Sequence, residues 1–124
     1  SIWIKANKSI TRSLVSQLKT IQDVYLNNKD NLDFFTDSYK NNLNFEISIN
    51  NNPFPSSSGE RKFSPMDRSL RRELKSTFGN DNYWFNTVNY LDIVEVRIRS
   101  GNKHLQFFFP KERIATSSKY SQWN

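Results

Sequence analysis

Several residue types that carry chemistry are missing from this chain of 124 residues, or are rare in it. It contains no cysteine, three isolated glycines and one histidine. Without cysteine there can be no disulfide, thiol nucleophile or cysteine-ligated metal, although oxidising and reducing compartments both tolerate such a chain. The scattered glycines exclude a glycine-rich phosphate loop, and one histidine leaves no second imidazole for a metal site.

Long apolar runs are also missing. No stretch approaches the roughly 20 residues needed to span a bilayer, and no signal peptide is recognisable. Because the chain begins at Ser1 rather than with methionine, we expect it to be a segment excised from a longer protein.

The acidic residues do not form a recognisable site. Asp30, Asp33 and Asp37 lie close in sequence, but a calcium loop needs alternating oxygen ligands and a distal glutamate, which are absent. They are best interpreted as the solvated start of a helix. No serine lies in a nucleophile elbow. We therefore expect no catalytic residue, metal or cofactor in this chain.

The chain does contain many aromatic residues and an excess of positive charge. Aromatic residues make up 15% of it and include ten phenylalanines, which indicates a real hydrophobic core because disordered chains are poor in aromatics. Its length suits a single domain over residues 1–124. The formal net charge of +6 permits nucleic acid or anionic surfaces as partners without selecting either.

The clearest structural signal lies in residues 91–109. Two arms alternate between apolar and polar residues on either side of Gly101 and Asn102, which both tolerate positive φ. Pro110 ends the second arm by removing a ladder donor. The pattern predicts a β-hairpin with one apolar face, which the rest of the chain must cover.

The remaining patterns predict helices and two further strands. The predicted elements are helices at residues 1–26, 32–43 and 64–78, strands at residues 45–49 and 83–88, the hairpin, and a helical stretch within residues 111–124. Ser64 and Pro65 form a strong helix start, Asp67 is placed to return a capping-box bond, and Gly79 suits a helix end. Residues 51–62 are rich in Asn, Pro and Ser and are expected to form a mobile loop. We therefore predict an α/β fold of the α+β type, a long N-terminal helix with helices packed on one face of a small antiparallel sheet.

The expected core joins the hairpin to the third helix and one strand. It consists of Leu70, Leu74, Phe78, Trp84, Val94, Val96, Ile98, Leu105, Phe107 and Phe109. The apolar stripe of the first helix is wider than one intramolecular contact needs. It predicts a possible dimer face made of Ile10, Leu14, Val15, Leu18 and Ile21. We accordingly expect a homodimer.

His104 is the first of two features that invite a functional interpretation. It lies mid-strand on the predicted polar face, where we expect a solvated or edge residue. The alternative is a general base or a pH-sensing group, since histidine titrates near neutrality.

The second is a basic cluster on the third helix, made of Arg68, Arg71, Arg72 and Lys75. It would suit phosphate. Acidic residues interleave with it, however, and neither a helix-turn-helix pair nor an RNA-binding motif is present. We expect a solvated or ion-paired face and no nucleic acid.

Three segments together resemble a known family. Residues 66–74, M-D-R-S-L-R-R-E-L, resemble its helix L-D-R-x-L-x-R-E-L. Residues 84–87, W-F-N-T, followed by residues 94–98, V-E-V-R-I, resemble its strand pair W-I-D-T … V-E-I-R-I. Residues 110–118, P-K-E-R-I-A-T-S-S, resemble its exit P-R-x-R-x-x-A-S-S/T. All occur in this order in the periplasmic sensor region of EnvZ-like histidine kinases, in the form typical of alphaproteobacteria.

The resemblance covers most of the chain except residues 27–63. It implies a PAS-like or PDC-like domain on the periplasmic face of the inner membrane, tethered at both ends by membrane helices. The dimerisation helix with its phospho-accepting histidine, and the lobe that uses ATP and Mg, would lie outside this chain. An OmpR-like response regulator would be the partner, and osmotic or envelope stress would be the usual stimulus. The chain itself would transmit a conformational signal without being an enzyme, and the surroundings of His104 do not match the phospho-acceptor.

Two tryptophans lie near the ends of the chain. Trp3 and Trp123 are expected to be membrane-proximal, because tryptophan favours the membrane–water interface. The alternative is that both are simply terminal aromatics. Two other interpretations of the whole chain also stay open: a small basic nucleic-acid-binding module, and an envelope or secretion-assembly domain of similar build.

Overall fold

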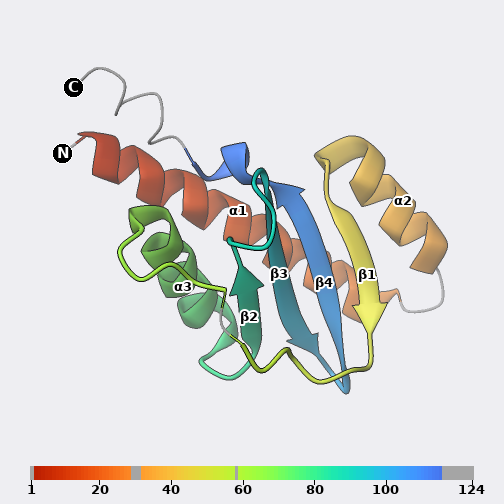
Figure 1. The fold of residues 1–124 in the computed structure, drawn as a ribbon. Helices are drawn as coiled ribbons and strands as arrows, with labels where there is room; N and C mark the ends of the chain where they lie inside the picture. Colours follow the sequence, from red (N-terminus) through yellow and green to blue (C-terminus); the bar gives the residue numbers. More distant parts are fainter. Residues whose placement is uncertain (1, 29–31, 58, 116–124) are drawn as a thin grey trace.

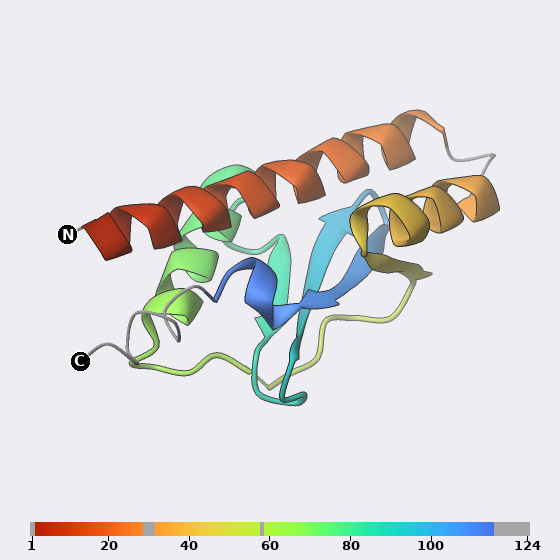
Figure 2. The same ribbon diagram turned by 90° about the horizontal axis from the view of Figure 1, so that it is seen from above.

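The computed structural model describes residues 2–28, 32–57 and 59–115, and arranges them as a helical layer over one antiparallel sheet (Figures 1 and 2). The elements are α1 (Ile2–Asn27), α2 (Leu32–Leu43), β1 (Glu46–Asn50), α3 (Pro65–Phe78), β2 (Tyr83–Asn86), β3 (Ile93–Ser100), β4 (Lys103–Pro110) and the 3-10 helix η1 (Lys111–Arg113). The predicted α+β architecture, with its long N-terminal helix, is confirmed.

The predicted hairpin, β3 and β4, forms the centre of the four-stranded sheet, whose order is β1-β4-β3-β2. Val96 lies opposite Phe107, and Ile98 lies opposite Leu105. Gly101 makes the turn with a φ of 71°, a left-handed value that glycine adopts without a steric penalty. The three strand pairs of this sheet are antiparallel, and their registers align the apolar faces of the two edge strands with that of the hairpin.

The start and end of α3 confirm the capping pattern of the sequence. The Ser64 hydroxyl accepts a hydrogen bond of 3.2 Å from the Asp67 N–H, and Pro65 occupies the first turn. At the other end, Gly79 takes a φ of 94° and donates its N–H to the Lys75 carbonyl at 3.0 Å. These caps fix the length of the helix and the position of its first turn.

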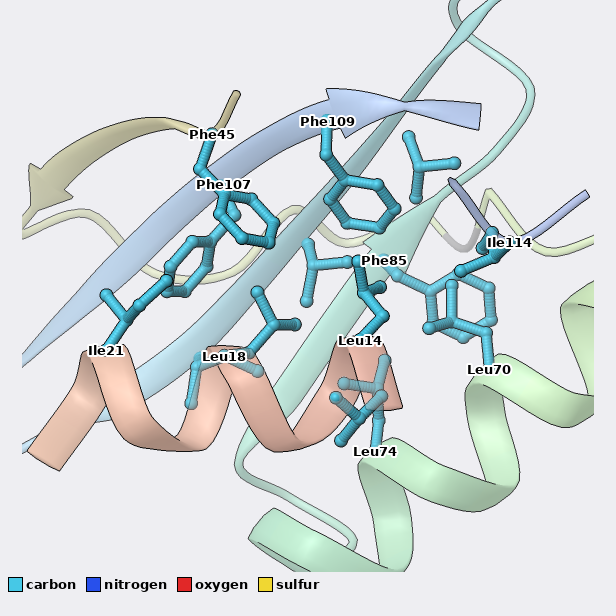
Figure 3. Close-up of a cluster of buried hydrophobic side chains, with 14 of the residues drawn as sticks. Leu14, Leu18, Ile21, Phe45, Leu70, Leu74, Phe85, Phe107, Phe109 and Ile114 are labelled. Carbon is cyan, nitrogen blue, oxygen red and sulfur yellow. The ribbon is translucent and has the colours of Figure 1, made fainter. Parts of the chain in front are cut away.

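The core lies between the two layers and is rich in phenylalanine (Figure 3). The ring of Phe45 meets those of Phe107 and Phe109 edge-on, with centroids 6.1 and 5.8 Å apart. Eight of the predicted core residues are at most 1% exposed: Leu70, Leu74, Val94, Val96, Ile98, Leu105, Phe107 and Phe109. Phe78 is only partly buried at the edge of this cluster.

The prediction that Trp84 belongs to the core is wrong, because its side chain lies on the outer face of the sheet, on the side away from the helices. Its register partner is Arg97, whose guanidinium lies 5.2 Å from the centre of the indole ring. Phe85, the next residue, points into the core and is 5% exposed. The aromatic content of β2 identified the strand, but with aromatics at successive positions it could not show which one faces inward.

The predicted dimer face is also corrected. Leu14, Val15, Leu18 and Ile21 are at most 2% exposed inside the domain's own core, and Ile10 is partly buried beside them. The stripe is wide because α1 crosses the sheet and also packs along α3 (Figure 1). Two intramolecular neighbours therefore account for its full width.

The chain returns to α1 after the sheet. Ile114, fully buried, joins the cluster near Leu14 and Leu70 (Figure 3). η1 accounts for the start of the helical stretch that was predicted near the C-terminus. Residues 116–124, with Trp123, lie outside the described residues, as does the side chain of Trp3.

Candidate functional site

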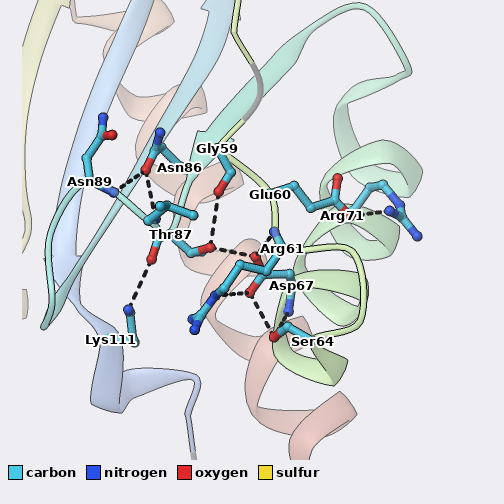
Figure 4. Close-up of polar contacts among 11 residues, drawn as sticks. Gly59, Glu60, Arg61, Ser64, Asp67, Arg71, Asn86, Thr87, Asn89 and Lys111 are labelled. Carbon is cyan, nitrogen blue, oxygen red and sulfur yellow. Dashed lines mark hydrogen bonds and ion pairs between the residues drawn. The ribbon is translucent and has the colours of Figure 1, made fainter.

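A buried carboxylate links α3 to the end of β2 (Figure 4). Asp67 is 0% exposed and accepts three hydrogen bonds: from the Arg61 N–H at 2.7 Å, from the Ser64 hydroxyl at 2.9 Å and from the Thr87 hydroxyl at 2.5 Å. The first turn of α3 positions this side chain, which the sequence identified only as a capping residue. A buried charge needs such donors to offset its desolvation.

Thr87 extends this link to the C-terminal segment. Its N–H donates to the Gly59 carbonyl at 3.2 Å, and its own carbonyl accepts from Lys111 Nζ at 3.0 Å. Lys111 also donates its N–H to the Asp92 carbonyl at 2.7 Å. We call Asp67, Thr87 and Lys111 the three-segment junction, because each belongs to one of the three segments on which the family resemblance depends.

Close packing at Asn86 supports the three-segment junction. The Asn86 side-chain oxygen accepts from the N–H groups of Val88 at 2.8 Å and Asn89 at 2.7 Å, which fixes the turn after β2. Gly59 runs beside it in an isolated parallel bridge. A Cβ on Gly59 would lie 2.0 Å from Asn86 Nδ2, so only glycine fits this approach.

The basic cluster of α3 lies next to this region. Arg71 is ion-paired with Glu60, and across the helix Glu73 pairs with Arg12 of α1 at 3.3 Å. Burial raises the pKa of Glu60, Arg71 opposes that shift, and Asp67 adds to it. Within the cluster, Arg71 is thus ion-paired inside the fold, and Arg68, Arg72 and Lys75 are exposed.

The outer face of the sheet carries a second polar network. Glu95 is 4% exposed and accepts from Arg97 Nε at 2.7 Å and from Gln106 Nε2 at 2.9 Å. His104 belongs to the same network, 3.4 Å from Arg97. The expectation that His104 is solvated is wrong, since the residue is 2% exposed. Burial lowers the pKa of His104, Arg97 and Arg99 lower it further, and Glu95 opposes them.

Residues 51–57 cover part of the outer face of the sheet. The Phe54 ring lies 5.0 Å from the His104 ring and 4.7 Å from the Arg99 guanidinium. Further along, the Ser57 carbonyl accepts from the Trp84 indole N–H at 2.9 Å. The segment lacks regular structure, as predicted, but it packs along the side of the sheet away from α1 (Figure 2). Its composition gave no signal for these contacts apart from the isolated Phe54.

An open cleft of about 460 Å³ lies where α2, the start of β1, the start of β3 and the end of β4 meet. Its volume falls within the usual range for small-molecule sites. It is lined by Lys40, Asn44, Phe45, Glu46, Tyr90, Ile93, Phe108, Phe109 and Pro110. Lys40 and Glu46 face each other at 3.7 Å, both well exposed, and Tyr90 meets Phe108 edge-on. The cleft can accept a molecule with an apolar body and a charged end. The residues that line the cleft come from separate segments of the chain, so no sequence pattern predicted it.

Within the described residues, no three His, Asp or Glu side chains gather in a way that could hold a metal ion. The helices of the described ranges include none that is both long and apolar enough to cross a bilayer.

Comparison with known proteins does not assign the chain to a family. No protein-family model matches it, and no curated protein is similar to it in sequence.

Proposed function

We propose that this chain is the extracytoplasmic sensing domain of a membrane-bound, EnvZ-like sensor histidine kinase, with a PAS-like fold. It lies on the periplasmic face of the inner membrane and is tethered there by membrane helices at both ends. It carries no catalytic role. ATP, Mg and the OmpR-like response regulator bind the cytoplasmic part of the parent protein.

The observation that carries this proposal is the three-segment junction. The three segments that resemble the family are far apart in sequence, yet each contributes one member: Asp67, Thr87 and Lys111. The resemblance between separate short stretches thus has one physical explanation, since Thr87 connects all three through two hydrogen bonds. Asn86 replaces the aspartate of the family pattern, and its oxygen accepts the two turn hydrogen bonds that a carboxylate would accept.

The exit segment also has the contacts that signal transmission needs. Arg113 donates to Gln17 of α1 at 2.7 Å and to the Leu43 carbonyl at the end of α2 at 2.9 Å. Its guanidinium lies 4.5 Å from the centre of the Phe45 ring. A shift of α1 relative to the sheet would therefore move the exit segment, as small helix shifts do in other switching proteins.

The proposed homodimer uses another surface than the buried stripe of α1. Tethering two copies in one membrane raises their effective concentration, so a weak contact is sufficient. The stimulus must favour one of two arrangements of α1 and the exit segment, because a ligand with equal affinity for both transmits nothing.

The flanking gene sequence tests the proposal at little cost. We expect an apolar helix of about 20 residues on each side of residues 1–124, followed on the C-terminal side by a kinase core. Alkaline phosphatase fused after Asn124, with the upstream membrane helix present, should be active because it is exported. A gene that encodes no kinase core, or a fusion that is made but has no phosphatase activity because it stays in the cytoplasm, would reject the sensor assignment.

A further inference from the structure

The loop before α3 presents an aromatic side chain to solvent. Phe63 is 90% exposed, the highest value among the large hydrophobic residues of the described ranges. Figures 1 and 2 both place this loop at the end of the molecule where α1 begins. A single exposed leucine on a surface needs no explanation, but an almost fully exposed phenylalanine in an anchored loop is unusual.

The loop is anchored on both sides of Phe63. The Arg61 N–H donates to the buried Asp67 carboxylate at 2.7 Å, and Ser64 caps α3 through the Asp67 N–H. The three-segment junction therefore fixes the ends of the loop. The hydrogen bonds on either side of Phe63 fix the backbone of this loop, so the exposure of the ring is a property of the fold.

Basic residues lie close to Phe63 in the sequence. Arg61 and Lys62 precede it, and Arg68 is exposed in the first turn of α3. The nearby carboxylates are occupied, since Glu60 pairs with Arg71 and the buried Asp67 lies 3.9 Å from the Arg61 guanidinium. Among the described residues, none is ion-paired with Lys62 or Arg68. An apolar tip within a basic rim matches an anionic lipid headgroup layer, where the ring reaches the acyl boundary.

We propose that Lys62, Phe63 and Arg68 form a lipid-binding tip that contacts the anionic headgroups of the bilayer in which the chain is anchored. This inference rests on the proposed function, which places the start of α1 next to the membrane. A single aromatic ring and a few cations bind weakly, but a tethered domain stays within reach of the surface, so weak binding is enough to set its orientation.

The β2–β3 loop, residues 87–92, offers a matched control. Leu91 is 86% exposed, nearly as much as Phe63, and its loop lies on the side of the sheet opposite α1 (Figure 2). Its neighbour is Asp92 rather than a basic residue. Hydrophobic exposure alone predicts equal effects at the two positions, whereas the lipid-binding tip predicts an effect only at Phe63.

Vesicle flotation tests the tip with the 124-residue chain itself. The vesicles contain phosphatidylglycerol and phosphatidylcholine in equal parts, or phosphatidylcholine alone, at low salt. We expect binding only to the anionic vesicles, and its loss at high salt. Phe63→Ser should weaken binding about tenfold, and Lys62→Ser or Arg68→Ser about fivefold each. Leu91→Ser should leave it unchanged, and circular dichroism should show that every variant is folded.

Three results would overturn the lipid-binding tip: no binding to anionic vesicles at low salt, equal binding by Phe63→Ser and the parent chain, or equal losses from Phe63→Ser and Leu91→Ser. Each of these leaves the sensor assignment intact, because that assignment is tested by the flanking sequence and by export. Vesicle binding in a chain that fails the export test would instead describe a peripheral membrane-binding protein.

Discussion

Replacing Asp67 by alanine should strongly destabilise the fold. The change removes the acceptor for three donors: the Arg61 N–H, the Ser64 hydroxyl and the Thr87 hydroxyl. Hydrogen bonds to a charged group contribute about 1.5–3 kcal/mol each, but they do not simply add, because removing the carboxylate also removes its own desolvation cost. The Thr87 hydroxyl keeps a second acceptor, the Gly59 carbonyl at 3.3 Å, whereas the Arg61 N–H loses its acceptor.

We therefore expect Asp67→Ala to lower the free energy of unfolding by about 3–5 kcal/mol, a large share of the total stability of a small domain. Thr87→Val should cost about 1–3 kcal/mol, since it removes one donor and leaves the charge. The double variant should lose less stability than the sum of the two single losses, by about 1 kcal/mol or more, because both changes break the same contact.

Urea unfolding followed by circular dichroism at neutral pH measures all three values. Asp81→Ala is the matched control, because that carboxylate is exposed and its loss should change stability by less than about 0.5 kcal/mol. A cost below about 1 kcal/mol for Asp67→Ala, or strict additivity with Thr87→Val, would refute the idea that these residues form one structural unit.

Three further predictions concern the core, the Gly59 contact and the covered sheet face. Phe107→Ala should cost about 3–5 kcal/mol in urea melts and Phe108→Ala much less, because Phe107 is fully buried between the layers and Phe108 is on the outer face; similar costs would mean that the two faces of β4 are misassigned. Gly59→Ala should destabilise the fold, since its Cβ would overlap Asn86, and an unchanged melting temperature would argue against this close approach. The pKa of His104 is lowered in the folded state, so the unfolded chain takes up the proton first, near pH 6.5. The stability that this residue contributes is complete above that pH and is lost as the pH falls through the folded-state pKa; His104→Gln should flatten this slope, and an identical slope would contradict it.

The sequence was sufficient for the elements whose patterns are regular. The four-residue spacing on α3, with Ser64 before it and Gly79 after it, set that helix almost to the residue. The alternation in β3 and β4 identified the inward residues of the hairpin, which all proved buried. Both patterns arise from local geometry, and local geometry can be read from one segment at a time.

The errors arise where a residue's surroundings come from elsewhere in the chain. Trp84 and His104 lie on the outer face, and residues 51–57 cover that face although their composition suggests a free loop. The stripe containing Val15 looked wider than the fold needs because the contact between α1 and α3 was not foreseen. The role of Asp67 as a link to Thr87 was missed for the same reason, since its capping function explained the residue fully at the local level.

Phosphotransfer by a chimaeric kinase tests the central proposal most directly. In this chimaera, residues 1–124 replace the periplasmic region of an EnvZ-like kinase, and phosphorylation of its response regulator is measured in membranes as osmolarity is varied. We expect phosphotransfer that changes with osmolarity and is shifted by Arg113→Ala, which breaks the contact of the exit segment with α1, but not by Arg72→Ala, an exposed arginine of α3. Phosphotransfer that is the same in all three proteins under every condition would contradict the account, because the chain would then pass no signal to the kinase.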